Sequence, residues 1–177
     1  MHKLVKLMFM VFLTMSNIMA SAALPENTIE IQLKDGSVLI ELYPDKAPNH
    51  VKRIKELASE GFYNGIVFHR VINGFMAQTG DPTGTGMGGS TKPNLKAEFN
   101  DVKFERGVLG MARSMDPNSA NSQFFIMFAS APHLNGEYTA FGKVISGMEY
   151  VDSIKKGSGA NGEVQNPDKM ISVKVLG

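Results

Sequence analysis

Short segments in which apolar and polar residues alternate, separated by turn signals, are the feature of this sequence that most limits its fold. The clearest pair is 28–34 and 37–43, joined by Asp35-Gly36. A period of two residues is typical of a half-buried β-strand, and Asp-Gly favours a two-residue hairpin turn. The pattern therefore predicts an antiparallel hairpin at this point of the chain.

The remaining segments continue this pattern without regular alternation of strands and helices. Two stretches show a helical apolar stripe: 46–59, which Gly61 follows, and 148–156, which Gly157 ends. About eight strands and two helices favour an antiparallel barrel or a sandwich, and two helices could cover the open ends of a barrel. Further strands are predicted at 66–72, 75–78, 108–112, 122–128, 139–145 and 170–176. The first helix carries charged or polar side chains that we expect to be solvated: His50, Lys52, Arg53, Lys55 and Glu56.

The amino terminus has the features of a secretory signal peptide. Two lysines precede the apolar run 7–13, and an Ala-x-Ala pattern follows it. This predicts a signal peptide at 1–22, cleaved after Ala22 or Ala23, and a single domain at 26–177. An uncleaved membrane anchor is the alternative, although a bilayer span needs about 20 apolar residues. We expect an exported, periplasmic protein with no membrane attachment after cleavage.

Composition excludes several classes of function. The chain has no cysteine, which rules out disulfides and thiolate metal sites. Removal of 1–22 takes away two lysines and no acidic residue, so the formal charge falls from +1 to −1. A chain with this charge has no excess of basic residues, which nucleic-acid-binding proteins usually have, so we expect no nucleic-acid partner. A loop at 79–89 holds five glycines, but neither a Lys-Ser/Thr pair nor a helical pattern follows, so we expect tight turns with positive φ there, not a phosphate site.

The segment 68–81 is the strongest candidate for a functional site. Asn73-Gly74 predicts a hairpin turn that sets Arg70 opposite Phe75, Met76 and Gln78. One permanent charge among aromatic and thioether side chains suggests a binding or catalytic site. His69 should point to the other face of the strand, and we expect it to be a structural, hydrogen-bonded histidine.

Three blocks of sequence resemble one family. These are Phe-His-Arg-Val-Ile-Asn-Gly-Phe-Met-Ala-Gln-Thr-Gly-Asp at 68–81, Gly-Val-Leu-Gly-Met-Ala at 107–112 with Asn-Ser-Gln-Phe-Phe-Ile at 121–126, and Leu-Asn-Gly-Glu-Tyr-Thr-Ala-Phe-Gly-Lys-Val at 134–144. In this order they are similar to the cyclophilin-type peptidyl-prolyl cis-trans isomerases, and the likeness extends over 28–176. The resemblance implies a closed eight-stranded antiparallel barrel capped by two α-helices, with the site on its outer face.

The resemblance also implies a role for each site residue. Arg70 would be the catalytic residue, and no metal or cofactor would take part. The partners would be unfolded or extended proline-containing polypeptides. The protein would assist the folding of exported proteins and would be a monomer. The substrate-binding residues would be Phe75, Met76, Gln78, Ala112, Arg113, Gln123, Phe125, Leu134 and Tyr138, with Ala112 and Arg113 acting through their backbone.

The chemistry of prolyl isomerisation suits a lone arginine. Amide resonance opposes rotation by about 18–20 kcal/mol, and no bond is made or broken, so neither a nucleophile nor a metal is needed. In the twisted amide the prolyl nitrogen regains a lone pair, and a guanidinium can donate a hydrogen bond to it. The chemistry therefore supports the role that the resemblance gives to Arg70.

Three positions depart from the family's common pattern. His133 stands where many members have a tryptophan that contacts cyclosporin, so we expect weak cyclosporin binding. Tyr138 replaces a common histidine, and its ring can still line the proline pocket. Arg113 replaces a common asparagine whose contact is through the backbone. The alternative function is a proline-peptide binding module or chaperone with incidental catalysis; a hydrolase would need a partnered nucleophile, which the pattern lacks.

Overall fold

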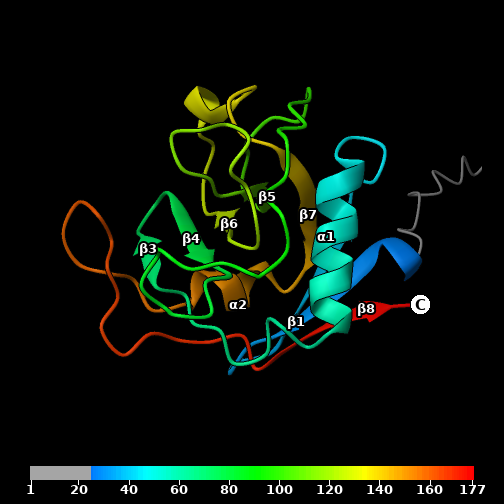
Figure 1. The fold of residues 1–177 in the computed structure, drawn as a ribbon. Helices are drawn as coiled ribbons and strands as arrows, with labels where there is room; N and C mark the ends of the chain where they lie inside the picture. Colours follow the sequence, from blue (N-terminus) through cyan, green and yellow to red (C-terminus); the bar gives the residue numbers. More distant parts are fainter. Residues whose placement is uncertain (1–24) are drawn as a thin grey trace, which may run out of the picture.

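The computed structural model describes residues 25–177, and the predicted signal peptide at 1–22 lies outside them. Its centre is one eight-stranded antiparallel sheet, curled into a half-barrel, in the order β3-β4-β6-β5-β7-β2-β1-β8 (Figure 1). The mainly-β prediction with two α-helices is confirmed. The strands are β1 (Thr28–Gln32), β2 (Ser37–Leu42), β3 (Arg70–Ile72), β4 (Met76–Thr79), β5 (Val108–Met111), β6 (Phe124–Met127), β7 (Ala140–Ser146) and β8 (Ser172–Leu176). The helices are α1 (Pro48–Ser59) and α2 (Met148–Asp152), with short 3-10 turns η1 (Pro25–Asn27) and η2 (Pro132–Leu134).

The prediction of a closed barrel is wrong, because β3 and β8 are the two edges of the sheet and do not pair. Strand β3 has only three residues, and the segment 157–164 takes its outer edge, where Val71 N donates to Gly162 O at 2.7 Å. This segment runs beside β3 in orange in Figure 1. Just before β3, Phe68 N donates to Asp168 O at 2.8 Å, so loop contacts take the place of a strand ladder.

The sheet buries apolar residues on both faces. Ile29, Ile31, Ile40 and their neighbours pack with the apolar stripe of α1 in the larger core. A second, smaller cluster forms on the outer face because successive strand residues point to opposite sides. In β6, Phe124 belongs to the larger core and Phe125 to the outer cluster. The outer cluster contains Met76, Phe104, Val108, Phe125, Met127, Ala131, Leu134 and Ala140.

Helix α2 is shorter than the predicted 148–156. It ends at Asp152, with Ser153 as its carboxyl-terminal cap. Beyond it, Ile154 is buried, and Lys155 N donates to Asp168 Oδ2 at 2.8 Å. In a longer helix the N–H of Lys155 would donate to a carbonyl of the preceding turn; here it donates to the Asp168 carboxylate instead.

The prediction that His50 and Arg53 are solvated is wrong. His50 is 0% exposed and Arg53 is 7% exposed, because the connector at 93–98 covers this side of α1. Glu98 lies at the amino-terminal end of α1, where its carboxylate accepts hydrogen bonds from the backbone N–H of Asn49 and of His50, each at 3.0 Å. The same carboxylate meets His50 Nδ1 at 2.6 Å. An acidic group at this end also complements the helix dipole.

This buried histidine predicts a pH dependence of stability. Burial lowers the pKa of His50, and Glu98 only partly offsets the effect; burial likewise lowers the pKa of His69. Below the unfolded-state pKa of about 6.5 the unfolded chain binds more protons than the folded one, so stability falls as pH falls. We expect the urea midpoint of unfolding to be lower at pH 5.5 than at pH 7.5.

Substitution of His50 separates its contribution to the pH dependence of stability from that of the other titrating groups. In His50→Asn the amide can still donate to Glu98 but does not titrate, so the midpoint should change less between the two pH values. His133→Asn, at an exposed position, is the matched control and should keep the full pH dependence. Equal pH dependence in His50→Asn and the unsubstituted protein would contradict this assignment.

In residues 25–177 no helix reaches the length and apolarity that a bilayer crossing requires.

Candidate active site

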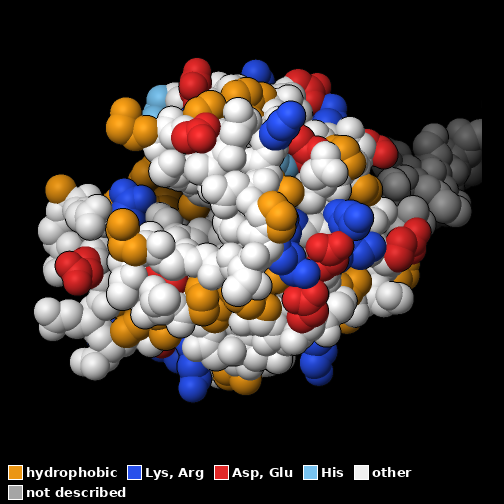
Figure 2. Space-filling view, viewed as in Figure 1, with side chains coloured by type: hydrophobic (Ala, Val, Ile, Leu, Met, Phe, Trp, Pro, Cys, Tyr) orange, Lys and Arg blue, Asp and Glu red, His pale blue; other side chains and the backbone are white. Residues whose placement is uncertain are grey.

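A cleft of about 870 Å³ lies on the outer face of the sheet, above the smaller apolar cluster. Part of the recess is visible at the left of Figure 2. Its walls come from β3, β4 and β6, the glycine-rich loop, the turn around η2 and the segment 157–164. Nine of the ten predicted site residues line it: Arg70, Phe75, Met76, Gln78, Ala112, Arg113, Phe125, Leu134 and Tyr138. The tenth, Gln123, lines an adjoining hollow of about 450 Å³.

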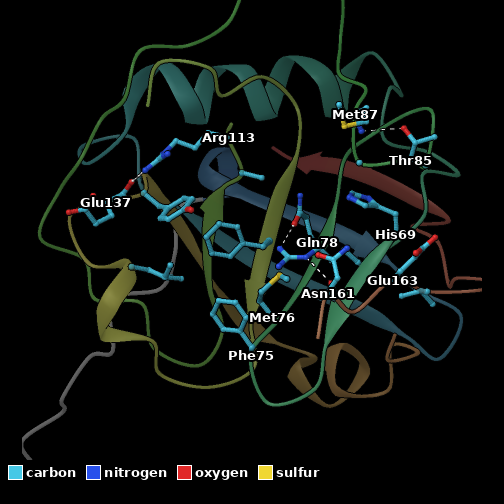
Figure 3. Close-up of a pocket in the computed structure, with 18 of the residues that line it drawn as sticks. His69, Phe75, Met76, Gln78, Thr85, Met87, Arg113, Glu137, Asn161 and Glu163 are labelled. Atoms are coloured by element: carbon cyan, nitrogen blue, oxygen red, sulfur yellow. Dashed lines mark hydrogen bonds between the residues drawn. The ribbon is translucent and has the colours of Figure 1, made fainter. Parts of the chain in front are cut away.

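Arg70 is fixed in place by acceptors on two sides. It pairs with Gln78 across the β3-β4 hairpin, as predicted, and its Nη1 donates to Gln78 Oε1 at 3.1 Å. Its Nε donates to the backbone oxygen of Asn161 at 2.9 Å. The guanidinium is therefore oriented by protein acceptors, while no bond to another residue of 25–177 occupies Nη2. Figure 3 shows Gln78 and Asn161, the two residues whose oxygen atoms accept these hydrogen bonds, close together in the cleft.

A relay of amides extends this support to the glycine-rich loop. Gln78 Nε2 donates to Gln123 Oε1 at 2.9 Å, and Gln123 Nε2 donates to the carbonyl oxygens of Gly86 and Gly88 at 3.1 and 2.8 Å. Every link uses a donor and an acceptor in good geometry, so the amide orientations are determined by the network. The position of Arg70 therefore depends on the loop.

The apolar wall of the cleft is built on aromatic packing. Phe125 meets Tyr138 edge-on, with ring centroids 5.8 Å apart, and lies 5.7 Å from Phe104. Gly110 sits behind it, and a Cβ there would lie 2.5 Å from both Phe104 Cε1 and Phe125 Cζ. Only a glycine at this position leaves room for Phe125 to face the cleft.

The side chain of Arg113 has contacts that the sequence did not predict. Its guanidinium carbon lies 4.4 Å from the centre of the Tyr138 ring, within the range of a cation–π contact. Its Nη2 donates to the backbone oxygen of Glu137 at 2.8 Å. The backbone N–H of Ala112 donates to Gln123 O at 3.0 Å, so that donor serves the fold.

The prediction of a hydrogen-bonded His69 is wrong. The side chain is 8% exposed, and its Nδ1 is buried without a hydrogen-bond partner. The ring packs beneath the glycine-rich loop, where a Cβ on Gly86 would be 3.4 Å from His69 Nε2. His69 precedes β3 and also lines the cleft, so the two-residue period of a strand does not set its direction. Because burial lowers the pKa of His69, the neutral form is favoured.

Asp81 organises the glycine-rich loop, and the sequence analysis missed it. The residue is 1% exposed, and its carboxylate accepts from Thr83 N at 2.7 Å, Thr85 N at 3.1 Å and Gly86 N at 2.6 Å. Burial raises the pKa of Asp81, but hydrogen bonds from the Thr83 hydroxyl and from the backbone N–H groups of Thr83, Gly88 and Gly86 outweigh it and lower the pKa to about 2. An Asp followed by a glycine-rich stretch is a known signal for such side-chain-to-backbone turns.

The expected loop conformation is confirmed. Gly80, Gly84 and Gly86 have φ of 92°, 69° and 87°, a region that residues with a Cβ rarely adopt. Within residues 25–177, no group of three or more His, Cys, Asp and Glu side chains is arranged to hold a metal ion.

Solved structures with the same architecture define the class of this fold. AquaCyp293, a cyclophilin from Hirschia baltica, matches with a TM-score of 0.78 and 27% identity, covering 86% of this chain and 75% of that one. A cyclophilin-type peptidyl-prolyl cis-trans isomerase from Cryptosporidium parvum, crystallised in the presence of the dipeptide Ala-Pro, matches with a TM-score of 0.78 and 33% identity. That match covers 85% of this chain and 99% of the other. The fold is that of the cyclophilins.

Sequence comparison extends the likeness from fold to activity. Residues 28–175 match the family described as cyclophilin type peptidyl-prolyl cis-trans isomerase/CLD. A probable peptidyl-prolyl cis-trans isomerase of Brucella suis is 59% identical over 168 residues, 88% of this chain and 86% of the relative. Peptidyl-prolyl cis-trans isomerase B of Bacillus subtilis is 46% identical over 127 residues, 71% of this chain and 88% of the relative. The chain belongs to the cyclophilin-type peptidyl-prolyl cis-trans isomerases, which confirms the predicted family and enzyme class.

Proposed function

We propose that this isomerase uses Arg70 as its catalytic residue and acts on exported polypeptides during folding. The observation that carries the catalytic role is the orientation of the guanidinium by Gln78 and Asn161 beside an apolar wall. A donor fixed before the substrate arrives needs no reorganisation as the amide twists. It favours the twisted amide over either planar form, because only the twisted nitrogen presents a lone pair.

The apolar residues of the cleft receive the proline ring. Met76, Phe125 and Leu134 are at most 6% exposed, so their cleft-facing surface is firmly packed from behind. Phe75 and Tyr138 complete the wall. With the ring held there, the preceding carbonyl turns while the prolyl nitrogen faces Arg70. Burial of the ring also removes water around the guanidinium, which strengthens its electrostatic effect.

The polar and backbone groups of the site have two different roles in our proposal, one for Gln78 and Gln123 and another for Ala112 and Arg113. Gln78 and Gln123 are joined to Arg70 by the amide relay, so their main role in our proposal is to orient the guanidinium. Ala112 and Arg113 lie on the wall shared by the cleft and the adjoining hollow, where an extended polypeptide would pass.

The role in folding exported proteins rests on the amino-terminal sequence. A basic start, an apolar run and an Ala-x-Ala pattern support cleavage after Ala22 or Ala23 and a mature periplasmic domain at 26–177. Cell fractionation and mass measurement of the purified protein test this. We expect a mass without the first 22 or 23 residues in the periplasmic fraction, and substitution of both Lys3 and Lys6 by glutamate should reduce its amount. A full-length protein confined to the cytosol would overturn the export proposal.

Weak inhibition by cyclosporin is a further expected result. His133 lies at the cleft, with its ring 5.8 Å from that of Phe75, and is exposed. An imidazole offers much less apolar surface than an indole to a large apolar inhibitor. We expect inhibition in the micromolar range and, in His133→Trp, an inhibition constant about tenfold lower, equal to about 1.4 kcal/mol. Titration of isomerase activity measures both constants, and a nanomolar constant for the unsubstituted protein would refute the expectation.

A further inference from the structure

Four charged residues line the cleft, two arginines and two glutamates, and only the side chains of the arginines form hydrogen bonds within the part of the chain that the structure describes. Arg70 donates to Gln78 and Asn161, and Arg113 donates to the backbone oxygen of Glu137. Glu137 and Glu163 are both exposed, and among residues 25–177 neither carboxylate accepts a hydrogen bond or forms an ion pair. The cleft therefore presents two carboxylates without partners in that range, whereas both guanidinium groups keep their charge but are held in place by neutral acceptors of the protein.

Glu163 is held next to Arg70. The two residues are partners in an antiparallel bridge, which sets their side chains side by side on one face. The backbone on both sides is fixed, since Val71 N donates to Gly162 O at 2.7 Å and Val164 N donates to His69 O at 3.1 Å. A Cβ on Gly162 would lie 2.5 Å from Ile72 Cγ1, so the segment packs closely against β3. Glu163 thus has a defined place at one end of the cleft.

Glu137 occupies the opposite end. Its N–H donates to Leu134 O at 3.0 Å, and its carbonyl is fixed by Arg113. Figure 3 shows Glu137 and Glu163 on opposite sides of the cleft, with the apolar wall between them. An extended polypeptide whose proline occupies that wall would reach one carboxylate on each side.

We propose that Glu137 and Glu163 make this isomerase select proline segments that carry lysine or arginine near the proline. The selection rests on the isomerase activity described above and determines which segments are turned over fastest. Glu163 also offsets the repulsion that Arg70 exerts on a cationic side chain passing beside it. Both carboxylates are exposed, so each pairing is worth little and changes kcat/KM by about two- to fivefold. The effect is screened as salt rises, because the Debye length falls from about 10 Å at 0.1 M to about 3 Å at 1 M.

Three matched proline peptides test this selection, with alanine, lysine or glutamate on both sides of an Ala-Pro unit. At low salt we expect kcat/KM to be highest for the lysine peptide, intermediate for the alanine peptide and lowest for the glutamate peptide. The ratio of kcat/KM for the lysine peptide to kcat/KM for the glutamate peptide should fall in Glu163→Gln and in Glu137→Gln. The double variant should bring the ratio close to one. Glu105→Gln removes the same charge at an exposed position outside the cleft and should leave the ratio unchanged.

The outcomes separate this inference from the activity on which it rests. Turnover of the alanine peptide without a preference for lysine over glutamate overturns the selection alone. The same holds if a preference persists in the double variant or falls equally in Glu105→Gln. Absence of turnover with all three peptides would overturn the isomerase activity itself, and the selection with it.

Discussion

Replacement of Arg70 by alanine is expected to lower kcat/KM on a proline peptide by at least about 10²-fold, the usual effect of removing one preorganised donor. The loss should appear in kcat because the donor acts on the twisted amide more than on the planar substrate. Arg70 is only half-buried on a sheet edge, so the urea midpoint should change little. A protease-coupled peptide assay and an unfolding curve on the same preparation measure both effects.

Arg70→Lys separates charge from geometry. A lysine keeps the positive charge but cannot engage Gln78 and Asn161 while presenting a further fixed donor, so most of the activity should still be lost. Lys174→Ala, at an exposed position of β8, is the control and should keep full activity. An unchanged rate in Arg70→Ala would refute the catalytic role. If that variant loses isomerisation but still supports refolding of client proteins fully, the alternative of a chaperone with incidental catalysis is favoured.

Asp81→Asn is expected to destabilise the protein by about 2–4 kcal/mol, because one amide oxygen cannot satisfy the donors that now converge on a buried carboxylate. Activity should also fall, since the loop carbonyls of Gly86 and Gly88 anchor Gln123 and, through it, Gln78 and Arg70. Urea unfolding and kcat/KM measure the two effects. Asp45→Asn, at an exposed position, is the matched control and should change neither.

The pH dependence of the Asp81 effect gives a second check. The folded-state pKa is lowered to about 2, so the carboxylate contributes stability fully above its unfolded pKa of about 3.9 and loses that contribution as pH falls through 2. The difference in unfolding free energy between Asp81→Asn and the unsubstituted protein should be constant above about pH 5 and shrink in stronger acid. A difference that disappears already at pH 5 would contradict the role of the ionised carboxylate.

Local patterns predicted the elements of this fold well. The alternation at 28–34 and 37–43 gives β1 and β2 in register across the Asp-Gly turn, with Gln32 opposite Ser37. The Asn-Gly signal gives the β3-β4 hairpin, with Arg70 opposite Gln78. These predictions succeed because a hairpin is specified by adjacent residues. The buried side of α1 at His50 was not predicted, because the chain that covers it comes more than 40 residues later.

The candidate site likewise has features that the local sequence predicted and features that depend on distant parts of the chain. The sequence by itself indicated which hairpin holds the arginine that we propose to be catalytic, since a lone arginine among apolar residues in one hairpin is a local pattern. Only the tertiary structure decided how that arginine is held. Its acceptor on Asn161 lies 91 residues away in sequence, and the partner of Gln78 on Gln123 lies 45 residues away. The pairing of the β3 edge with the segment 157–164, and not with β8, was also decided by the tertiary structure. Backbone donors pair with whichever acceptors the folded chain brings near, and no local pattern encodes that choice.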